Sequence, residues 1–115
     1  MTTDVIDAGT FAELQDTAGA EFVAELVGTF LEEAPAMLAD LRSARSAGDA
    51  ERFRREAHSL KSNCNTFGAL GLGAMARELE LRGLATDPAL DAAALDALDA
   101  AYAQVAATLR ELTHG

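Results

Sequence analysis

The segment that decides the fold is DAERFRREAHSLKSNCNTFG, residues 49–68. At about 100° per residue, its apolar side chains fall within about 40° of one direction around a helix axis. They are Phe53, Ala57, Leu60, Cys64 and Phe67. Asp49 suits the N-cap, and Gly68 suits the left-handed position after the last turn. The segment therefore predicts an amphipathic helix over 50–67, with one face in a core.

The rest of the chain carries similar patterns on both sides of this helix. Apolar residues at intervals of three and four, with Gly48, Gly83 and Asp87-Pro88 as breaks, indicate further helices. Their expected ranges are 8–17, 21–47, 70–82 and from 88 onward. Long helices with short connections pack as antiparallel neighbours. The sequence predicts an all-α fold, an antiparallel up-and-down four-helix bundle with a short N-terminal capping helix, as a single domain over 1–115.

Residue patterns on the flanking helices indicate which of their faces are buried. The expected apolar stripe of the second helix is Phe22, Leu26, Phe30, Met37 and Leu41. Pro35 is expected to bend this helix near Leu31, and Gly28 to allow a close helix contact. The acidic residues of the last helix are expected to form a solvated face.

Composition limits the classes of protein to which the chain can belong. It has 115 residues, 50% of them hydrophobic, which is enough for one core. The net charge of −10 argues against nucleic acid and anionic membranes as partners. The single Cys64 excludes an internal disulfide, and no signal peptide or apolar run of about 18 residues is present. We therefore expect a cytoplasmic protein.

The other face of the 50–67 helix carries the candidate chemistry. His58 lies there, and the side chains within about 60° of it include Arg54, Arg55, Lys61, Ser62 and Asn65. Residues 42–61 hold six of the nine basic residues and three acidic ones, a charge of +3 in a chain of −10. A basic segment around an exposed histidine suits a site that holds an added anion.

The imidazole of His58 suits a nucleophile that attacks phosphorus. An exposed imidazole is largely neutral at pH 7, so one ring nitrogen keeps a free lone pair. Lys61, the only lysine, lies one turn away and would partly offset the added charge. His58 is expected in mid-helix, where backbone amides are already bonded and form no anion cradle. The metal, cations and in-line positioning that phosphoryl transfer needs must then come from a partner.

The motif around His58 resembles the signature of histidine-containing phosphotransfer (HPt) domains, which include the phosphoacceptor domain of chemotaxis kinases. The resembling runs are Ala57-His58-Ser59-Leu60-Lys61-Ser62 and Thr66-Phe67-Gly68-Ala69. The flanking runs similar to the family are Phe30-Leu31-Glu32-Glu33-Ala34-Pro35 before the motif and Arg77-Glu78-Leu79-Glu80 after it.

The resemblance implies a monomeric bundle whose His58 exchanges phosphoryl groups with an Asp of response-regulator receiver domains, in a phosphorelay that includes a histidine kinase or hybrid kinase. It implies that Lys61 faces the phosphoryl group, that the chain binds no cofactor or metal of its own, and that Mg²⁺ is held by the receiver. The chain is then a phosphocarrier without its own substrate pocket. The expected partner-binding residues are Arg54, Arg55, Ser62 and Asn65.

Two positions depart from the family pattern. Ser62 stands where the family usually has Gly, and Asn65 replaces another position that is often small. Ser62 is still small, so docking is expected to survive. Asn65 either narrows the choice of partners or hydrogen-bonds the imidazole.

Two further questions stay open at this level. Arg54 and Arg55 either face the phosphate or pair with Glu51 and Glu56 along the helix. The alternative function for the whole chain is a helical adaptor or inhibitor that docks on a receiver or kinase without carrying phosphate.

Overall fold

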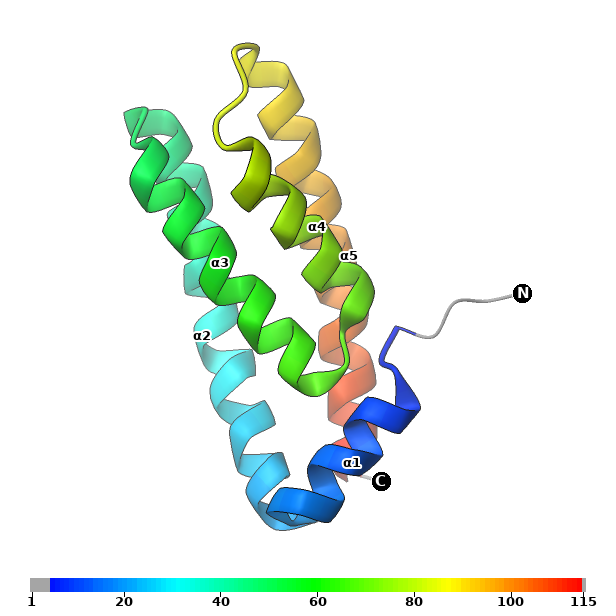
Figure 1. Ribbon diagram of the computed structural model, residues 1–115. Coiled ribbons are helices and arrows are strands. Elements are labelled where there is room, and N and C mark those ends of the chain that lie inside the picture. Colours follow the sequence, from blue (N-terminus) through cyan, green and yellow to red (C-terminus); the bar gives the residue numbers. More distant parts are fainter. Residues whose placement is uncertain (1–4, 115) are drawn as a thin grey trace, which may run out of the picture.

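The computed structural model describes residues 5–114 and contains five helices and no strand within that range (Figure 1). In chain order they are α1 (Ala8–Ala18), α2 (Ala20–Ala47), α3 (Ala50–Phe67), α4 (Leu70–Arg82) and α5 (Pro88–His114). The predicted ranges of α3 and α4 agree at both ends, so the prediction of an all-α fold is confirmed. Within the described range, no helix is long and apolar enough to cross a membrane.

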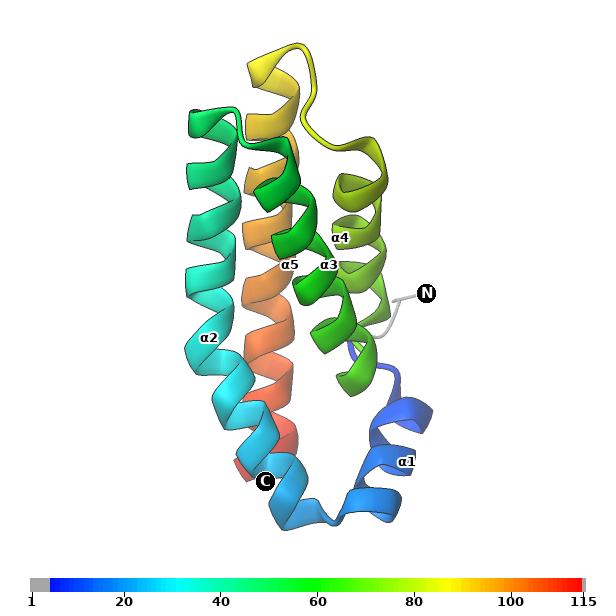
Figure 2. The same ribbon diagram turned by 60° about the vertical axis from the view of Figure 1, so that its left-hand side comes forward.

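Helices α2 to α5 lie side by side along the long axis of the molecule in both views (Figures 1 and 2). α3 packs against α2 and α4, and α5 also packs against these two helices, so α3 and α5 lie on a diagonal. The short α1 contacts α2 and α3 and lies at the end of the molecule where α2 begins. This arrangement covers one side of α3 and leaves its other side to solvent.

Local chemistry fixes both ends of α3. The Asp49 side chain accepts a hydrogen bond from the Arg52 backbone N–H at 3.1 Å, as an N-cap does. Gly68 follows the last turn with φ +84°, and the next N–H, that of Ala69, donates to the Cys64 carbonyl at 2.8 Å. A side chain at position 68 would also meet backbone of the segment before α1. Glycine is therefore required there by both conformation and space.

The predicted apolar face of α3 is the centre of the core. Its five residues are at most 3% exposed, and Phe53, Ala57, Leu60 and Cys64 are fully buried. Burial raises the pKa of the Cys64 thiol to about 12, so this cysteine is a core residue and not a reactive thiolate. Because this face is fixed in the core, the opposite face of α3 is fixed toward solvent.

The predicted buried face of α2 was wrong by about one position at its start. Phe22 is 52% exposed, whereas the next residue, Val23, is fully buried. One residue is about 100° around the helix, so only one of the two can face the core. The buried residues of α2 are Val23, Val27, Phe30, Ala34, Leu38, Leu41 and Ala44. Gly28 makes no close helix contact either, since a Cβ there would meet open space.

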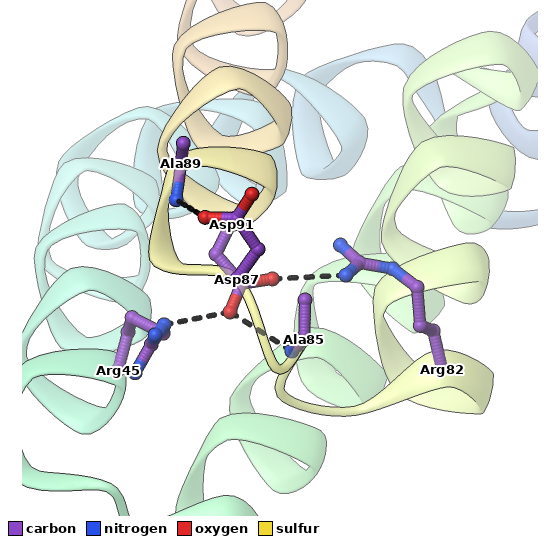
Figure 3. Close-up of polar contacts among 6 residues, drawn as sticks. All are labelled: Arg45, Arg82, Ala85, Asp87, Ala89 and Asp91. Atoms are coloured by element: carbon purple, nitrogen blue, oxygen red, sulfur yellow. Dashed lines mark hydrogen bonds and ion pairs between the residues drawn. The ribbon is translucent and has the colours of Figure 1, made fainter.

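The prediction of a solvated acidic face on α5 was wrong for Asp91. Its side chain is completely buried and lies between two arginines, one from α2 and one from α4 (Figure 3). Its Oδ2 is 2.7 Å from Arg45 Nε and accepts from the Ala85 N–H at 3.0 Å, and its Oδ1 accepts from Arg82 Nη1 at 3.0 Å. A buried carboxylate is tolerated where cations and N–H donors replace its hydration.

Candidate functional site

His58 lies in the middle of α3, on the face that points away from the core. Its side chain is 57% exposed, so both the ring and the space beside it are open to a partner. The neighbouring residues Ala57 and Leu60 are buried, and they fix the orientation of this face. The structure therefore places the sequence-predicted histidine at the surface of the molecule, outside its core.

A carboxylate from the next helix joins His58 and Lys61. Glu80, in the last turn of α4, has Oε2 at 2.7 Å from His58 Nδ1 and Oε1 at 2.8 Å from Lys61 Nζ. The Glu80 and Lys61 side chains are both about one-fifth exposed, 23% and 22%. The structure thus brings the predicted His58 and Lys61 together through one shared carboxylate.

Sequence reasoning missed Glu80 as a site residue. It was seen only as part of a run that resembles the family. A signal did exist, because α3 and α4 are joined by a short turn at Gly68. Two helices joined in this way face each other at similar distances from the turn, and His58 and Glu80 lie ten and twelve positions from it.

The charges of this group favour one form of the imidazole. The hydrogen bond from Lys61 is the main cause that lowers the pKa of Glu80; partial desolvation opposes it, and His58 adds to the lowering. An ionised carboxylate only accepts hydrogen bonds, so a neutral His58 carries its proton on Nδ1 and donates it to Glu80. The other nitrogen, Nε2, then keeps its lone pair.

Arg54 and Arg55 do not form the helix-surface ion pairs that were one alternative for them. Within residues 5–114, neither is paired with Glu51 or Glu56. Arg54 instead lies across Gly83, where an added Cβ would be 2.5 Å from its Nη2. Both arginines are exposed.

Ser62 and Asn65 lie on the exposed face of α3, as predicted. Asn65 packs over Gly73 of α4, where a Cβ would be 2.4 Å from its Oδ1. Within the described residues, His58 has a hydrogen bond with Glu80 and none with Asn65. Asn65 therefore does not bond the imidazole, and the space that Gly73 leaves allows α3 and α4 to approach closely.

The basic segment over residues 42–61 is not gathered around His58. Three of its six cations pair with acids away from the site: Arg42 with Asp96 and Asp99, Arg45 with Asp91, and Arg52 with Asp40. The charge count was correct, but its interpretation as one anion-binding surface was wrong. Arg42 and Arg45 lie on α2, and of the four cations on α3 only Arg52 points away from the face that carries His58.

Comparisons with known proteins agree with this geometry. The curated proteins that were compared include no match to the chain. Among solved structures, the chain is similar to the crystal structure of histidine-containing phosphotransfer protein B (HptB) from Pseudomonas aeruginosa PAO1, at 27% identity with a TM-score of 0.85. The alignment covers 98% of this chain and 97% of that one. The Hpt domain matches residues 25–108, and the chain therefore belongs to the histidine-containing phosphotransfer (HPt) domain family.

Proposed function

We propose that this chain is a phosphocarrier in which Nε2 of His58 accepts a phosphoryl group and passes it on. In the step from a phosphorylated receiver, the Nε2 lone pair attacks phosphorus, the N–P bond forms, and the P–O bond to the receiver's aspartate breaks. The aspartate leaves as a carboxylate, and the ring keeps its Nδ1 proton and becomes cationic. Reversal of the same step delivers the phosphoryl group to another aspartate.

The observation that carries the proposal is the contact between His58 Nδ1 and Glu80 Oε2 at 2.7 Å. It holds the tautomer in which Nε2 is the nucleophile. It also places a negative charge beside the ring that becomes positive as the N–P bond forms, so it stabilises the transition state more than the ground state.

Lys61 is proposed to bind the phosphoryl oxygens. Its ammonium group has three N–H donors, and one of them is used by Glu80 at 2.8 Å. The remaining donors lie one helical turn from His58, on the same face of α3. Lys61 can therefore contact the added group while it keeps its contact with the carboxylate.

The remaining catalytic parts are proposed to belong to the partner. His58 is in mid-helix, so its own helix offers no free backbone N–H to a phosphate. Phosphoryl transfer needs a divalent cation and in-line alignment. We assign the Mg²⁺ to the receiver domain and treat the transfer as catalysed jointly, with no cofactor bound by this chain.

The proposed partners are response-regulator receiver domains and a histidine kinase or hybrid kinase. They would dock on the solvent face of α3, where Arg54, Arg55, Ser62 and Asn65 are exposed. The proposal treats the chain as a monomeric single domain over 1–115, an antiparallel up-and-down four-helix bundle with α1 as its cap. A cytoplasmic setting would keep the one cysteine reduced.

The test is transfer of labelled phosphate from a phosphorylated receiver or an active kinase to the full chain. We expect label that is acid-labile and base-stable, and we expect it to be lost in His58→Gln. The matched control is His114→Gln, which removes the only other histidine and should label like the wild type. Label that persists on His58→Gln would refute His58 as the acceptor. A wild type that binds receivers but takes no label would support a non-phosphorylated adaptor instead.

A further inference from the structure

The buried carboxylate of Asp91 joins three segments at the end of the molecule that holds the α4–α5 connection (Figure 3). Its Oδ2 contacts Arg45 of α2 and the Ala85 N–H of the connection, whereas its Oδ1 contacts Arg82 of α4. The two carboxylate oxygens of Asp91 therefore bind different arginines. The two arginines can be removed one at a time while the carboxylate keeps another partner.

Arg82 is the last residue of α4, and Glu80 lies two residues before it in the same turn. Terminal turns of helices are the segments that open most readily, because few contacts hold them. Besides the buried Leu79 and the contacts of Glu80 itself, three further contacts hold the end of this turn: the Gly83 N–H donates to the Leu79 carbonyl at 2.8 Å, Arg54 lies over Gly83, and Arg82 is bound to Asp91. Only the last of these ties the turn to α5.

We propose that Asp91 is a positioning residue for the phosphotransfer site. Through Arg82 it keeps the last turn of α4 wound, and so it holds Glu80 where one carboxylate reaches both His58 and Lys61. The inference rests on the proposed function, since it explains how the tautomer of the phosphoacceptor is maintained from α5, which lies diagonally across the bundle from α3.

Burial suits Asp91 to this role. Its side chain has no exposed surface, so water does not replace the arginines easily, and the low local dielectric strengthens the attraction. When the turn opens, Glu80 leaves Nδ1, the imidazole proton is free to move to Nε2, and the nucleophilic lone pair is lost from the position that faces the partner.

The matched experiment compares Arg82→Gln with Arg45→Gln in the full chain. Both remove one arginine from the same buried carboxylate, but only Arg82 lies on α4 with Glu80. ¹⁵N NMR of the histidine ring, in a His114→Gln background so that one imidazole gives the signal, reports which nitrogen carries the proton. Transfer from a phosphorylated receiver reports the consequence for rate.

We expect Arg82→Gln to shift the His58 ring signals toward the Nε2–H tautomer and to slow transfer by about three- to tenfold. Arg45→Gln should leave the ring signals and the transfer rate near those of the wild type. Arg82→Lys keeps the charge and should therefore recover part of the wild-type behaviour. Asp91→Asn should behave like Arg82→Gln, and it replaces that variant in the comparison if Arg82→Gln does not fold.

Equal effects in the α4 and α2 variants would overturn the inference, because they would show a general loss of stability. Unchanged ring signals in Arg82→Gln would overturn it as well. The ring signals are read on unphosphorylated protein, so their outcome is independent of whether transfer occurs. A wild type that takes no label would instead count against the proposed function.

Discussion

Two carboxylates in this molecule each bridge two basic side chains, but they differ in burial. Glu80 is 23% exposed and contacts His58 and Lys61. Asp91 has no exposed surface and contacts Arg45 and Arg82. The contact distances are similar, between 2.7 and 3.0 Å in every case. Both sites therefore share one arrangement, a carboxylate between two basic side chains, and they differ in solvent exposure.

The difference shows that burial decides whether water or a ligand can replace a carboxylate in its ion pairs. At the surface, water and a phosphoryl group can take the place of a carboxylate at low cost, because the local dielectric is high. In the interior, removal of one partner leaves an uncompensated charge. Under the proposed function, Glu80 shares Lys61 with the added phosphoryl group, whereas Asp91 keeps both of its arginines. The variants below test this division, from the largest expected effect to the smallest.

The largest effect is expected when a carboxylate is buried with no partner at all. Leu60→Asp places a charge on the fully buried face of α3 and removes a core side chain. We expect a loss of about 5 kcal/mol, enough to unfold the chain, since unpaired burial and the lost packing add together. Far-UV circular dichroism and thermal unfolding measure it. Ser62→Asp, on the exposed face of the same helix, is the control and should stay folded.

The next effect compares the two carboxylates directly. Asp91→Ala should lower the free energy of unfolding by about 3 kcal/mol, because Arg45 and Arg82 lose their shared partner but both retain some access to water. Glu80→Ala should cost far less, since water solvates the released His58 and Lys61. Urea denaturation of the two variants gives the comparison. Equal losses would show that burial does not separate the two sites.

The sequence could predict those features that depend on the local pattern of one helix. Capping residues and one-sided periodicity on residues 49–68 determined the bounds of α3, the buried face and the exposure of His58. These are local properties of one helix. Phe22 was misplaced because a phenylalanine and a valine in adjacent positions both fit an apolar pattern, and only packing against neighbouring helices selects Val23.

The contacts of Glu80 and Asp91 could not be predicted in this way, because they depend on how separate helices pack against each other. An acidic residue on a helix is usually solvated, and Asp91 departs from that rule only because arginines of α2 and α4 meet it in space. Glu80 likewise becomes part of the site through the register of α4 on α3. Long-range pairing also occupies two cations of the basic segment over residues 42–61: Arg42 is bound to Asp96 and Asp99 of α5, and Arg52 to Asp40 of α2.

A smaller effect on stability, but a clear one on function, is expected for Lys61→Ala. The side chain is 22% exposed and its carboxylate partner can turn to water, so the protein should stay folded. Transfer from a receiver should slow by about tenfold, since one charge-assisted hydrogen bond to the phosphoryl group is lost. Arg110→Ala, which removes an exposed cation on α5 and away from the docking face, is the control. If the Lys61→Ala variant were unfolded, this would contradict the placement of the Lys61 side chain at the surface.

The smallest effect concerns pH and follows from the lowered pKa of Glu80, whose main cause is the hydrogen bond from Lys61. A carboxyl group with a lowered folded pKa contributes stability above the ordinary glutamate range and loses it as pH falls through the lowered value. The difference in unfolding free energy between wild type and Glu80→Gln should thus shrink as pH falls below about 5.

The matched measurement repeats this series in a Lys61→Ala background. Because the main cause of the lowered pKa is then absent, Glu80→Gln should change the acid side of the stability profile much less than it does with Lys61 present. A difference that grows as pH falls, or one that is indifferent to Lys61, would mean that the ammonium group is not the dominant partner of Glu80. In that case the carboxylate would be bound mainly to His58, and less free to share its partners with a phosphoryl group.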